Sequence, residues 1–524
     1  MIATHRVKDK YDKTIGFMVG GLEGKFIPLR DVKKNIIQFE NLEELKNGVI
    51  RSAHEKVSEV KLRALNLIKY RHICEENQFN RDIQLKLRKW KHSKSGNALV
   101  VVGAKHTGKT VEVLKFVYSS YDRIIYVNLK NDKGFRNVMK NFNMFTTEMK
   151  WYCCMNGLPD FLDDESTVIV IDSVHESIKG NSSIAKVKSN TKCTIIAISD
   201  LEQAVLGYEH DNYRGLDRLN MRALSFSEFC FALGCDIDAK DKIYNSNECD
   251  KLYELYEVYR NIGGYPEVVT EYIKYKNINR CYGIIQKIVN EFKEAAEKRV
   301  TLNNKRCTKK IYKKIYRSIL MIPYLYDPCN SKVHTISDEL NRTFKRDLTG
   351  DVGNIINWFN SNGLLGECIL YANGSTDDKP ARKIRYYFTD CGIASYIGKQ
   401  LGVNEARFKG VVTETFAFNE LSRLYDVKDS KRLVSGSGVS FSTLDSYELD
   451  FFIIDNYGKR YGIEIKYNRG RAKSLKTYLQ NGLVDYGIMA NHSNGYCANE
   501  IKNIPIFSVG IGFPYKSYRN GKEN

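Results

Sequence analysis

Four short runs of apolar residues recur along the middle of the chain, and longer stretches with helical spacing lie between them. The runs occupy residues 97–102, 123–127, 168–171 and 194–198. A nearly continuous apolar run of this length is typical of a strand that is buried on both faces of a parallel sheet. The intervening stretches are long enough for crossover helices. The pattern therefore predicts a three-layer α/β sheet.

The hydrophobic pattern changes on both sides of this sheet. Before it, residues 14–29 contain two strand-like runs around a Gly-Gly turn, which is typical of a hairpin. After it, residues 241–299 show helical spacing, which indicates a small helical lid. Two helices at 336–340 and 352–359 and a strand at 386–388 then give the outline of a winged helix.

We expect several domains, because a chain of 524 residues is too long for one. A helix around 414–424 followed by alternating strands indicates a further α/β domain near the end of the chain. The expected parts are a small N-terminal module with a hairpin and a helix (1–60), an α/β core (61–235), a helical lid (236–300), a winged-helix segment (301–400) and a C-terminal α/β domain (401–524).

The first strand of the core runs directly into a loop with two glycines. The loop satisfies the pattern G-x-x-x-x-G-K-[ST], with a strand before it and a helix after it. In such a P-loop the backbone N–H groups surround the β-phosphate of a nucleotide, Lys109 reaches the β and γ phosphates, and the Thr110 hydroxyl binds Mg²⁺. The sequence therefore predicts ATP and Mg²⁺ as ligands of Gly103, Ala104, Lys105, His106, Thr107, Gly108, Lys109 and Thr110.

Polar residues follow two further strands of the predicted core. Asp172 ends an apolar strand and is a candidate to organise the Mg²⁺ shell during hydrolysis. Ser199 and Asp200 end the next strand, where polar side chains can sense the γ-phosphate, although both also suit a simple turn. Arg214, with Arg218 and Arg222 nearby, is a candidate arginine finger. The alternative for these arginines is a surface or DNA contact.

A second set of acids lies in the last part of the chain. Asp450 is on the predicted strand 447–454, and Glu464 and Lys466 are on the strand that follows a turn. Residues two apart on a strand point to the same face, so Glu464 and Lys466 project together. Asp450 and Glu464 can then bind Mg²⁺, with Lys466 positioning an attacking water and Glu414 contributing from the preceding helix. This is the PD-(D/E)XK nuclease arrangement.

Non-catalytic roles of these acids also fit the sequence. A Glu and a Lys two residues apart also occur on solvent-facing strands as a simple ion pair, and Glu414 also suits a helix-surface acid paired with Arg423. Asp445 and Glu448 are weaker alternatives to Asp450. A domain with this fold can also serve only as a binding module.

Several motifs together resemble the prokaryotic AAA+ ATPases that carry a C-terminal domain of unknown function. They are the P-loop, residues 224–229, 263–267 and 387–392, and the C-terminal acids, in that order. The resemblance covers about residues 80 to 480. It implies an ATPase core, a helical lid, a winged helix and a domain with the restriction-endonuclease-like fold.

The chain also departs from this family at the strand that ends in Asp172. The family usually has an Asp-Glu pair followed by glutamine, whereas Ser173 and His175 occupy those places here. Glu176 or His175 can be considered as a substitute for the missing glutamate, but neither has the usual spacing. Arg214-Gly215 likewise stands where the family commonly has glycine and then arginine. ATP hydrolysis is therefore less secure than ATP binding.

The charge of the chain favours a polyanionic partner. Lysine and arginine number 81 against 62 acids, which gives a formal net charge of +19 and a pI of about 9.1. The stretch 298–317 and the cluster Lys428, Lys431 and Arg432 would contact phosphates, unless both are only solvated lysine-rich faces. We expect a nucleic acid partner, DNA in particular, and leave homo-oligomerisation open.

The cellular setting is predicted from what the sequence does not contain. The thirteen cysteines include no C-x-x-C pair, and no apolar run reaches the ~20 residues that cross a bilayer. The first residues are charged and lack the apolar stretch of a signal peptide. We therefore expect a cytoplasmic protein with reduced thiols and no membrane association.

Our main hypothesis is an ATP-binding, AAA+-like protein whose nucleotide state controls a DNA-contacting, Mg²⁺-dependent nuclease-like domain. As an enzyme it would be a weak ATPase, with DNA cleavage as a second activity. The alternative is a non-catalytic nucleotide switch or scaffold that binds nucleic acid or protein, which Ser173 favours. A helicase-type motor is a third hypothesis, for which we find no further helicase motif.

Overall fold

The computed structural model describes most of the chain in two compact units, Met1–Met221 and Arg222–Asn524. The described residues are 4–8, 14–19, 25–28, 79–155, 161–174, 180–200, 215–235, 237, 246–303, 307–327, 330–371, 383–425, 436–455, 457–468, 470–493, 496–498 and 501–510.

The first unit begins with a small antiparallel sheet. Its strands are β1 (Thr4–Lys8), β2 (Thr14–Val19) and β3 (Lys25–Pro28), with β2 in the middle. Strands β2 and β3 correspond to the predicted hairpin, whereas β1 comes from a charged segment in which we predicted no strand. The predicted helix of this N-terminal module lies outside the described residues.

A five-stranded parallel sheet forms the centre of the first unit. Its order is β5-β6-β7-β4-β8, and every neighbouring pair is parallel. The strands are β4 (Ala98–Val102), β5 (Arg123–Asn128), β6 (Thr167–Asp172), β7 (Thr194–Ser199) and β8 (Leu216–Asn220). The α/β class with a parallel sheet is therefore confirmed. Strand β8 was not predicted, because it is a partly exposed edge strand with only two apolar residues.

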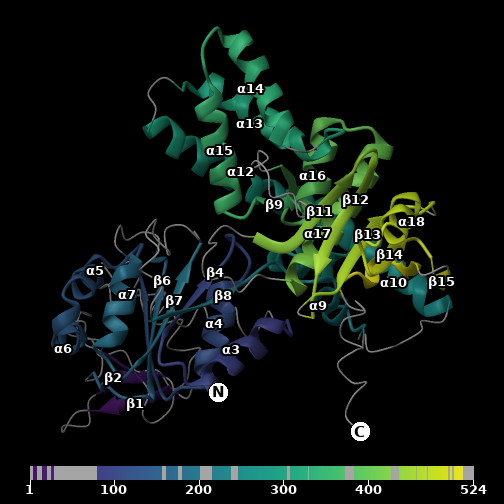
Figure 1. The fold of residues 1–524 in the computed structure, drawn as a ribbon. Helices are drawn as coiled ribbons and strands as arrows, with labels where there is room; N and C mark the ends of the chain where they lie inside the picture. Colours follow the sequence, from purple (N-terminus) through teal and green to yellow (C-terminus); the bar gives the residue numbers. More distant parts are fainter. Residues whose placement is uncertain are drawn as a thin grey trace. The chain divides into compact units, whose positions relative to one another are not determined.

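Helices cover both faces of this sheet (Figure 1). On one face, α3 (Asp82–Ser93) and α4 (Lys109–Tyr118) bury Leu87, Leu114 and Phe116 against strand residues such as Val101 and Val170. Helix α7 (Gly180–Ser189) packs on β4 and β7, and is itself adjacent to α5 (Lys133–Lys140). A short 3₁₀ turn, η1 (Phe142–Met144), leads into α6 (Phe145–Met155).

The second unit begins with four helices. They are α9 (Phe226–Ala232), α10 (Ser246–Ile262), α11 (Pro266–Tyr275) and α12 (Ile278–Asn303). Helix α10 packs on α16 (Cys391–Leu401) and α17 (Glu405–Leu424). The segment predicted as a lid of the ATPase core thus belongs to the same compact unit as the C-terminal part of the chain.

Three more helices are followed by an antiparallel hairpin. The helices are α13 (Lys309–Met321), α14 (Asn330–Phe344) and α15 (Thr349–Ser361), with the 3₁₀ turn η4 (Ile322–Tyr324) after the first. The hairpin pairs β9 (Leu365–Leu370) with β10 (Ile384–Phe388). Helices α14 and α15 and strand β10 contain the two predicted helices and the predicted strand, whereas α13 and β9 were not predicted, and the winged helix itself stays a prediction.

The hairpin continues into the sheet of the C-terminal part. The eight strands have the order β10-β9-β11-β12-β13-β14-β16-β15, and β9 pairs with β11 in parallel (Figure 1). The C-terminal elements are β11 (Gly436–Leu444), β12 (Tyr447–Ile454), β13 (Arg460–Ile465), α18 (Lys473–Gln480), β14 (Tyr486–Asn491), β15 (Tyr496–Ala498), β16 (Ile501–Pro505) and the 3₁₀ turn η5 (Ile506–Ser508). Across the described part of the chain, no helix combines the length and apolar character that crossing a bilayer requires.

Candidate functional site

The P-loop lies between the buried strand β4 and the start of α4. His106 and Gly108 have positive φ angles of 63° and 90°, which fold the loop back on itself before the helix begins. Gly108 is the N-cap of α4 and provides no side-chain cap for the first N–H groups of the helix. Uncapped N–H groups at the start of a helix are suited to an anion.

Backbone from β8 approaches the start of this loop. The Met221 N–H donates to the Val102 carbonyl at 2.7 Å. A Cβ atom on Gly103 would lie 2.0 Å from the Met221 carbonyl oxygen, far inside van der Waals contact. Glycine is therefore required at position 103 by packing as well as by the loop pattern, and the P-loop is in direct contact with the last residue of the first unit.

The Lys109 ammonium is held inside the loop by three oxygen atoms. It donates to the carbonyl oxygens of Gly103 at 2.9 Å and Ala104 at 2.7 Å, and it pairs with Asp200 Oδ1 at 2.8 Å. Asp200 directly follows β7, the neighbour of β4, while Ser199 at the end of β7 is fully buried. Since Lys109 is buried, phosphate oxygens would have to replace some of these partners.

Asp172 at the end of β6 contacts Thr110 in the first turn of α4, although β6 and β4, the strand before α4, are not neighbours. The Thr110 hydroxyl donates to Asp172 Oδ2 at 2.8 Å, and the Tyr126 hydroxyl donates to the same oxygen at 2.8 Å. Strand β7 separates β6 from β4, but parallel strands present their carboxyl ends at one edge of the sheet. The pair offers a hydroxyl and a carboxylate, which are ligands that Mg²⁺ accepts.

Fewer of the residues that we considered for ATP hydrolysis can be placed, because several of them lie outside the described residues. Ser173 has φ 58°, and its N–H donates to Asp172 Oδ1 at 2.6 Å. His175, Glu176 and Arg214 lie outside the described residues. Arg218 is on β8 and donates from Nε and Nη2 to Asn220 Oδ1 at 2.9 and 2.7 Å, so it is engaged within its own strand.

Comparison with known proteins supports this description of the first unit. Residues 95–230 match the model of the AAA domain family. These residues therefore form a P-loop, AAA-like domain. The match covers much less than half of the chain, so it assigns this segment and not the whole protein. No curated protein matches the sequence.

Solved structures resemble parts of this chain only distantly. A Walker-type ATPase of Pyrococcus abyssi is 11% identical, with 62% of this chain and 96% of that chain covered and a TM-score of 0.37. A katanin structure is 13% identical, with coverages of 40% and 66% and a TM-score of 0.22. PCH-2 of C. elegans is 14% identical, with coverages of 43% and 72% and a TM-score of 0.27. Scores this low support no argument about function.

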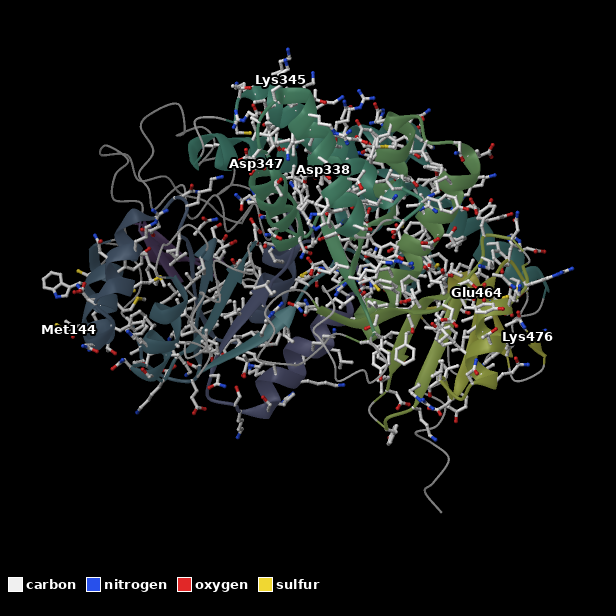
Figure 2. The ribbon with its side chains drawn as sticks, turned by 45° about the horizontal axis from the view of Figure 1, so that its top comes forward. Met144, Asp338, Lys345, Asp347, Glu464 and Lys476 are labelled. Atoms are coloured by element: carbon white, nitrogen blue, oxygen red, sulfur yellow. The ribbon has the colours of Figure 1, made fainter. Side chains whose placement is uncertain are left out.

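The predicted C-terminal acids meet on neighbouring strands of the second unit. The antiparallel register that pairs Phe451 with Ile463 places Asp450 opposite Glu464 when it is continued by one residue. Asp450 Oδ2 accepts from the Ile465 N–H at 2.7 Å. Glu464 Oε1 pairs with Lys466 Nζ at 2.8 Å, whereas the buried Glu464 Oε2 has no hydrogen-bond partner among the described atoms. Figure 2 labels Glu464 on this sheet.

Glu414 on α17 faces the same cluster. Burial, and then the Asp450 carboxylate, raise the pKa of Glu414, while Arg407 and Arg385 oppose that rise. Burial also raises the pKa of Asp450, against the lowering effects of Lys466 and the Ile465 N–H. For Lys466, burial acts to lower the pKa, but Asp450 and Glu464 outweigh it and the pKa is raised. Burial is thus the largest cause of the raised pKa of both Glu414 and Asp450.

The alternative partners of these acids are engaged elsewhere. Arg423 pairs with Glu420 at 3.3 Å, and not with Glu414. Glu448 forms an ion pair with Arg385, and Asp445 is an exposed residue in the turn between β11 and β12. Arg385 is buried and stacks on Phe441, with 4.1 Å from its Cζ to the ring centroid. The sequence did not indicate Arg385, because only the sheet order brings β10 near β12.

The fit of this cluster to Mg²⁺ is partial. Asp450 and Glu464 can provide carboxylate oxygens, and the unpartnered Glu464 Oε2 is an available ligand atom. In the described ranges, however, no group of three or more His, Cys, Asp and Glu side chains is arranged to hold a metal ion. A metal here would depend on two protein carboxylates, with water or phosphate oxygens completing its shell.

The remaining family-like motifs meet at one place, which we call the junction: Leu224, Gly264, Asp390 and Arg423. The Leu224 N–H donates to Gly264 O at 2.7 Å, and the Gly264 N–H donates to Asp390 Oδ2 at 2.8 Å. Arg423 donates to the carbonyl oxygens of Ala223 at 2.7 Å and Leu224 at 3.2 Å. These motifs therefore fix the backbone where the chain enters the second unit.

Proposed function

We propose that ATP bound in the first unit controls the second unit, and that the second unit contacts DNA through a nuclease-like domain with a Mg²⁺-dependent carboxylate site. The observation that carries this proposal is the path of the chain after β8. Met221 contacts the P-loop backbone at Gly103, and Leu224 is held in the junction. Only Arg222 and Ala223 separate the two anchors.

The residues present suit the nucleotide and its metal. The N–H groups of the P-loop and of the α4 N-terminus would donate to the β-phosphate, and Lys109 would exchange its contacts with Gly103 and Ala104 for phosphate oxygens. Thr110 and Asp172 would hold Mg²⁺, which supplies positive charge to the phosphates when bound. A displacement of the loop at Gly103 would also displace Met221. The short segment that follows Met221 would transmit this movement to Leu224 in the junction.

The element order supports the nuclease-like fold of the C-terminal part. Helix α17 leads into the antiparallel strands β11, β12 and β13, and α18 then connects β13 to the parallel strand β14. Asp450, Glu464 and Lys466 lie together on β12 and at the end of β13. In the proposed reaction the two carboxylates would hold Mg²⁺, and the Lys466 ammonium would orient the attacking water or stabilise developing charge.

A non-catalytic switch is the second candidate, and Ser173 favours it. The side chain of Ser173 has no carboxylate, so it cannot act as the base that a glutamate provides at this position. In this version the AAA-like domain binds ATP without turning it over, and the C-terminal fold binds DNA without cleaving it.

Nucleotide binding is tested first, with the full chain and a fluorescent ATP analogue. We expect Lys109→Ala to weaken binding at least tenfold, since Lys109 is the buried cation of the loop. Lys89→Ala is the control, because Lys89 is an exposed lysine of α3 outside the loop, and it should bind within about twofold of the wild type. Equal binding by wild type and Lys109→Ala would contradict the proposed site.

Coupling is tested by hydrogen exchange of the full chain with and without Mg²⁺-ATP. We expect the nucleotide to slow exchange in peptides from 222–232 and 263–270 in the wild type and to have no effect on them in Lys109→Ala. Protection confined to the first unit would refute control of the second unit.

Cleavage is tested on linear, nicked and single-stranded DNA with Mg²⁺. We expect Asp450→Asn and Lys466→Ala to abolish it, while the control Asp445→Asn removes an exposed turn carboxylate and leaves it intact. If the wild type binds DNA and cuts none of these substrates, the nuclease assignment fails and the non-catalytic switch stands.

A further inference from the structure

Helix α13 presents an exposed face made entirely of cations. Its buried residues are Ile311, Tyr312, Ile315, Tyr316, Ile319 and Leu320, whereas its exposed residues Lys309, Lys310, Lys313, Lys314 and Arg317 all carry positive charge. The helix contains no acid. At 100° per residue the five cations occupy an arc of about 140°, and they extend over roughly 12 Å along the axis.

These charges are unpaired and their helix is firmly held. Within the described part of the chain, none of the five cations takes part in a hydrogen bond or an ion pair. The opposite face of α13 is fixed by neighbouring helices: the Tyr312 hydroxyl donates to Lys293 O of α12 at 2.7 Å, and the Tyr316 ring lies 5.7 Å from that of Phe359 on α15. The cations therefore project from a helix that is packed on its other face, and no acid side chain in the described part of the chain competes with a partner for them.

The neighbouring helices lack this character. Helix α15, the third of the three, has no lysine or arginine and carries Asp351 in its first turn. Helix α14 and the turn after it expose both signs of charge, as Figure 2 shows for Asp338, Lys345 and Asp347. Contacts to a polyanion would thus come from α13. They would not come from α15, the third helix, although the later helix of a helix-turn-helix usually enters the DNA groove.

We propose that the exposed face of α13 binds the phosphate backbone of DNA without reading its sequence. Lysine and arginine that face phosphates position a protein on a duplex but carry no base information. A membrane surface fits less well, because the apolar face of α13 is buried in the second unit and cannot enter lipid. An acidic protein also fits less well, since the face offers no apolar anchor of the kind on which protein interfaces depend.

This inference rests on the proposed DNA contact and refines it, and salt dependence tests it directly. Binding of a labelled 30-base-pair duplex to the full chain is followed by fluorescence anisotropy at several NaCl concentrations. Each phosphate contact contributes about 0.9 to the slope of log Kobs against log[NaCl]. We expect the triple variant Lys309→Ala, Lys313→Ala, Arg317→Ala to reduce that slope by about 2 to 3 and to weaken binding of all duplex sequences equally.

The matched control removes three exposed cations from a helix of the other unit. Lys86, Arg88 and Lys89 of α3 are exposed, and their replacement by alanine should leave the slope unchanged. The triple variant Lys309→Arg, Lys313→Arg, Arg317→Lys keeps the charges and should keep the slope. Equal thermal unfolding of all variants shows that the differences are not due to misfolding.

The experiment distinguishes a failure of the proposed DNA contact from a failure of its assignment to α13. If the wild type binds no duplex, the DNA contact of the proposed function fails together with this inference. If the wild type binds and the α13 and α3 alanine variants have equal slopes, only the assignment to α13 is overturned. Loss of binding to phosphatidylserine vesicles or to polyglutamate in the α13 variant, with DNA binding retained, would likewise overturn it in favour of a lipid or acidic protein partner.

Discussion

Gly103 shows how one residue can serve both packing and ligand binding. Its missing Cβ leaves room for the Met221 carbonyl, and its own carbonyl accepts a hydrogen bond from Lys109. The pattern of the P-loop predicted a glycine at this position for the phosphate. The contact with Met221 could not be predicted, since it depends on an edge strand that the hydrophobic pattern did not indicate.

We expect Gly103→Ala to lower the free energy of unfolding of the first unit by about 1–3 kcal/mol, because the methyl group would overlap a backbone atom that cannot rotate away. Gly134→Ala is the control: its Cβ would make only an ordinary 3.4 Å contact with Asp132 Oδ1 in the first turn of α5. There alanine should be neutral or stabilising by up to about 1 kcal/mol. Urea unfolding of both variants gives the comparison, and equal midpoints would show that Met221 does not constrain the loop.

Asp485 provides a pH-dependent contribution to stability. Its side chain accepts from the Arg460 guanidinium at 2.9 Å and from the Arg460 N–H at 2.8 Å. The guanidinium, and then the backbone N–H, lower the pKa of Asp485 to about 2. The native state therefore binds fewer protons than the unfolded state between pH 4 and pH 2, so this stabilisation is present above about pH 4 and is lost as the pH falls toward 2.

We expect Asp485→Asn to lower the free energy of unfolding by no more than about 1 kcal/mol at pH 7, because both partners are about one-third exposed to solvent. The difference from the wild type should shrink when urea unfolding is repeated at pH 4 and pH 3. Asp338→Asn, at an exposed position on α14, is the control and should show no such trend. A difference for Asp485→Asn that stays constant down to pH 3 would be incompatible with the lowered pKa.

At the level of elements, the motif at the start of α9 has a structural role as a helix cap. The residues Ser225 to Glu228 form a capping box at the start of α9, in which the Ser225 side chain accepts from the Glu228 N–H and Glu228 Oε2 accepts from the Ser225 N–H. We had interpreted this stretch only as a family motif. Its S-x-x-E spacing is also the sequence signature of a helix start, so the N-terminus of α9 was predictable.

We expect Ser225→Ala to destabilise the second unit by about 1 kcal/mol, because the Glu228 N–H at the start of α9 loses the Ser225 hydroxyl as its acceptor. Ser225→Thr preserves the hydroxyl and should retain most of that stability. Thermal unfolding of the full chain compares the two variants. If alanine and threonine behaved alike, the cap would not matter to the second unit.

Strand prediction succeeded where a strand consists mainly of apolar residues and failed where polar and charged residues predominate. Strands β4, β5, β6 and β7 consist mainly of apolar residues, and the sequence indicates them directly. Strand β8 has only two apolar residues, Leu216 and Leu219, and because they are three positions apart they show no strand alternation. The same limit applies to β1, whose segment contains His5, Arg6 and Lys8.

At the level of the whole molecule, the sequence predicted residues that belong to a motif or to a recognisable strand and its end, and missed those that have no such signal. The P-loop could be identified from eight adjacent residues. Tyr126, which donates to Asp172, and Arg385, which lies near Glu414 and Asp450, have no local sequence signal. Each reaches its site through the order of strands in a sheet, and that order was not predicted.

Binding of ATP should change the stability of one unit much more than that of the other. At a free concentration one hundred times its Kd, a ligand that binds only the native state stabilises it by about 2.7 kcal/mol. Calorimetry of the full chain with Mg²⁺-ATP should therefore raise one unfolding transition by several degrees, and Lys109→Ala should abolish the increase. An unchanged melting profile in the wild type at saturating nucleotide would be inconsistent with an ATP site in the first unit.

The parallel pairing of β9 with β11 has a mechanical consequence for the second unit. It joins the hairpin that follows α15 to the strands that carry Asp450 and Glu464 in one hydrogen-bonded sheet. The helices before the hairpin and the two acids are thus held in a fixed relation, which a flexible linker between them would not provide. A duplex bound at one end of this sheet would therefore always reach the other end at the same distance along its length. The protein would then cover the same length of any DNA.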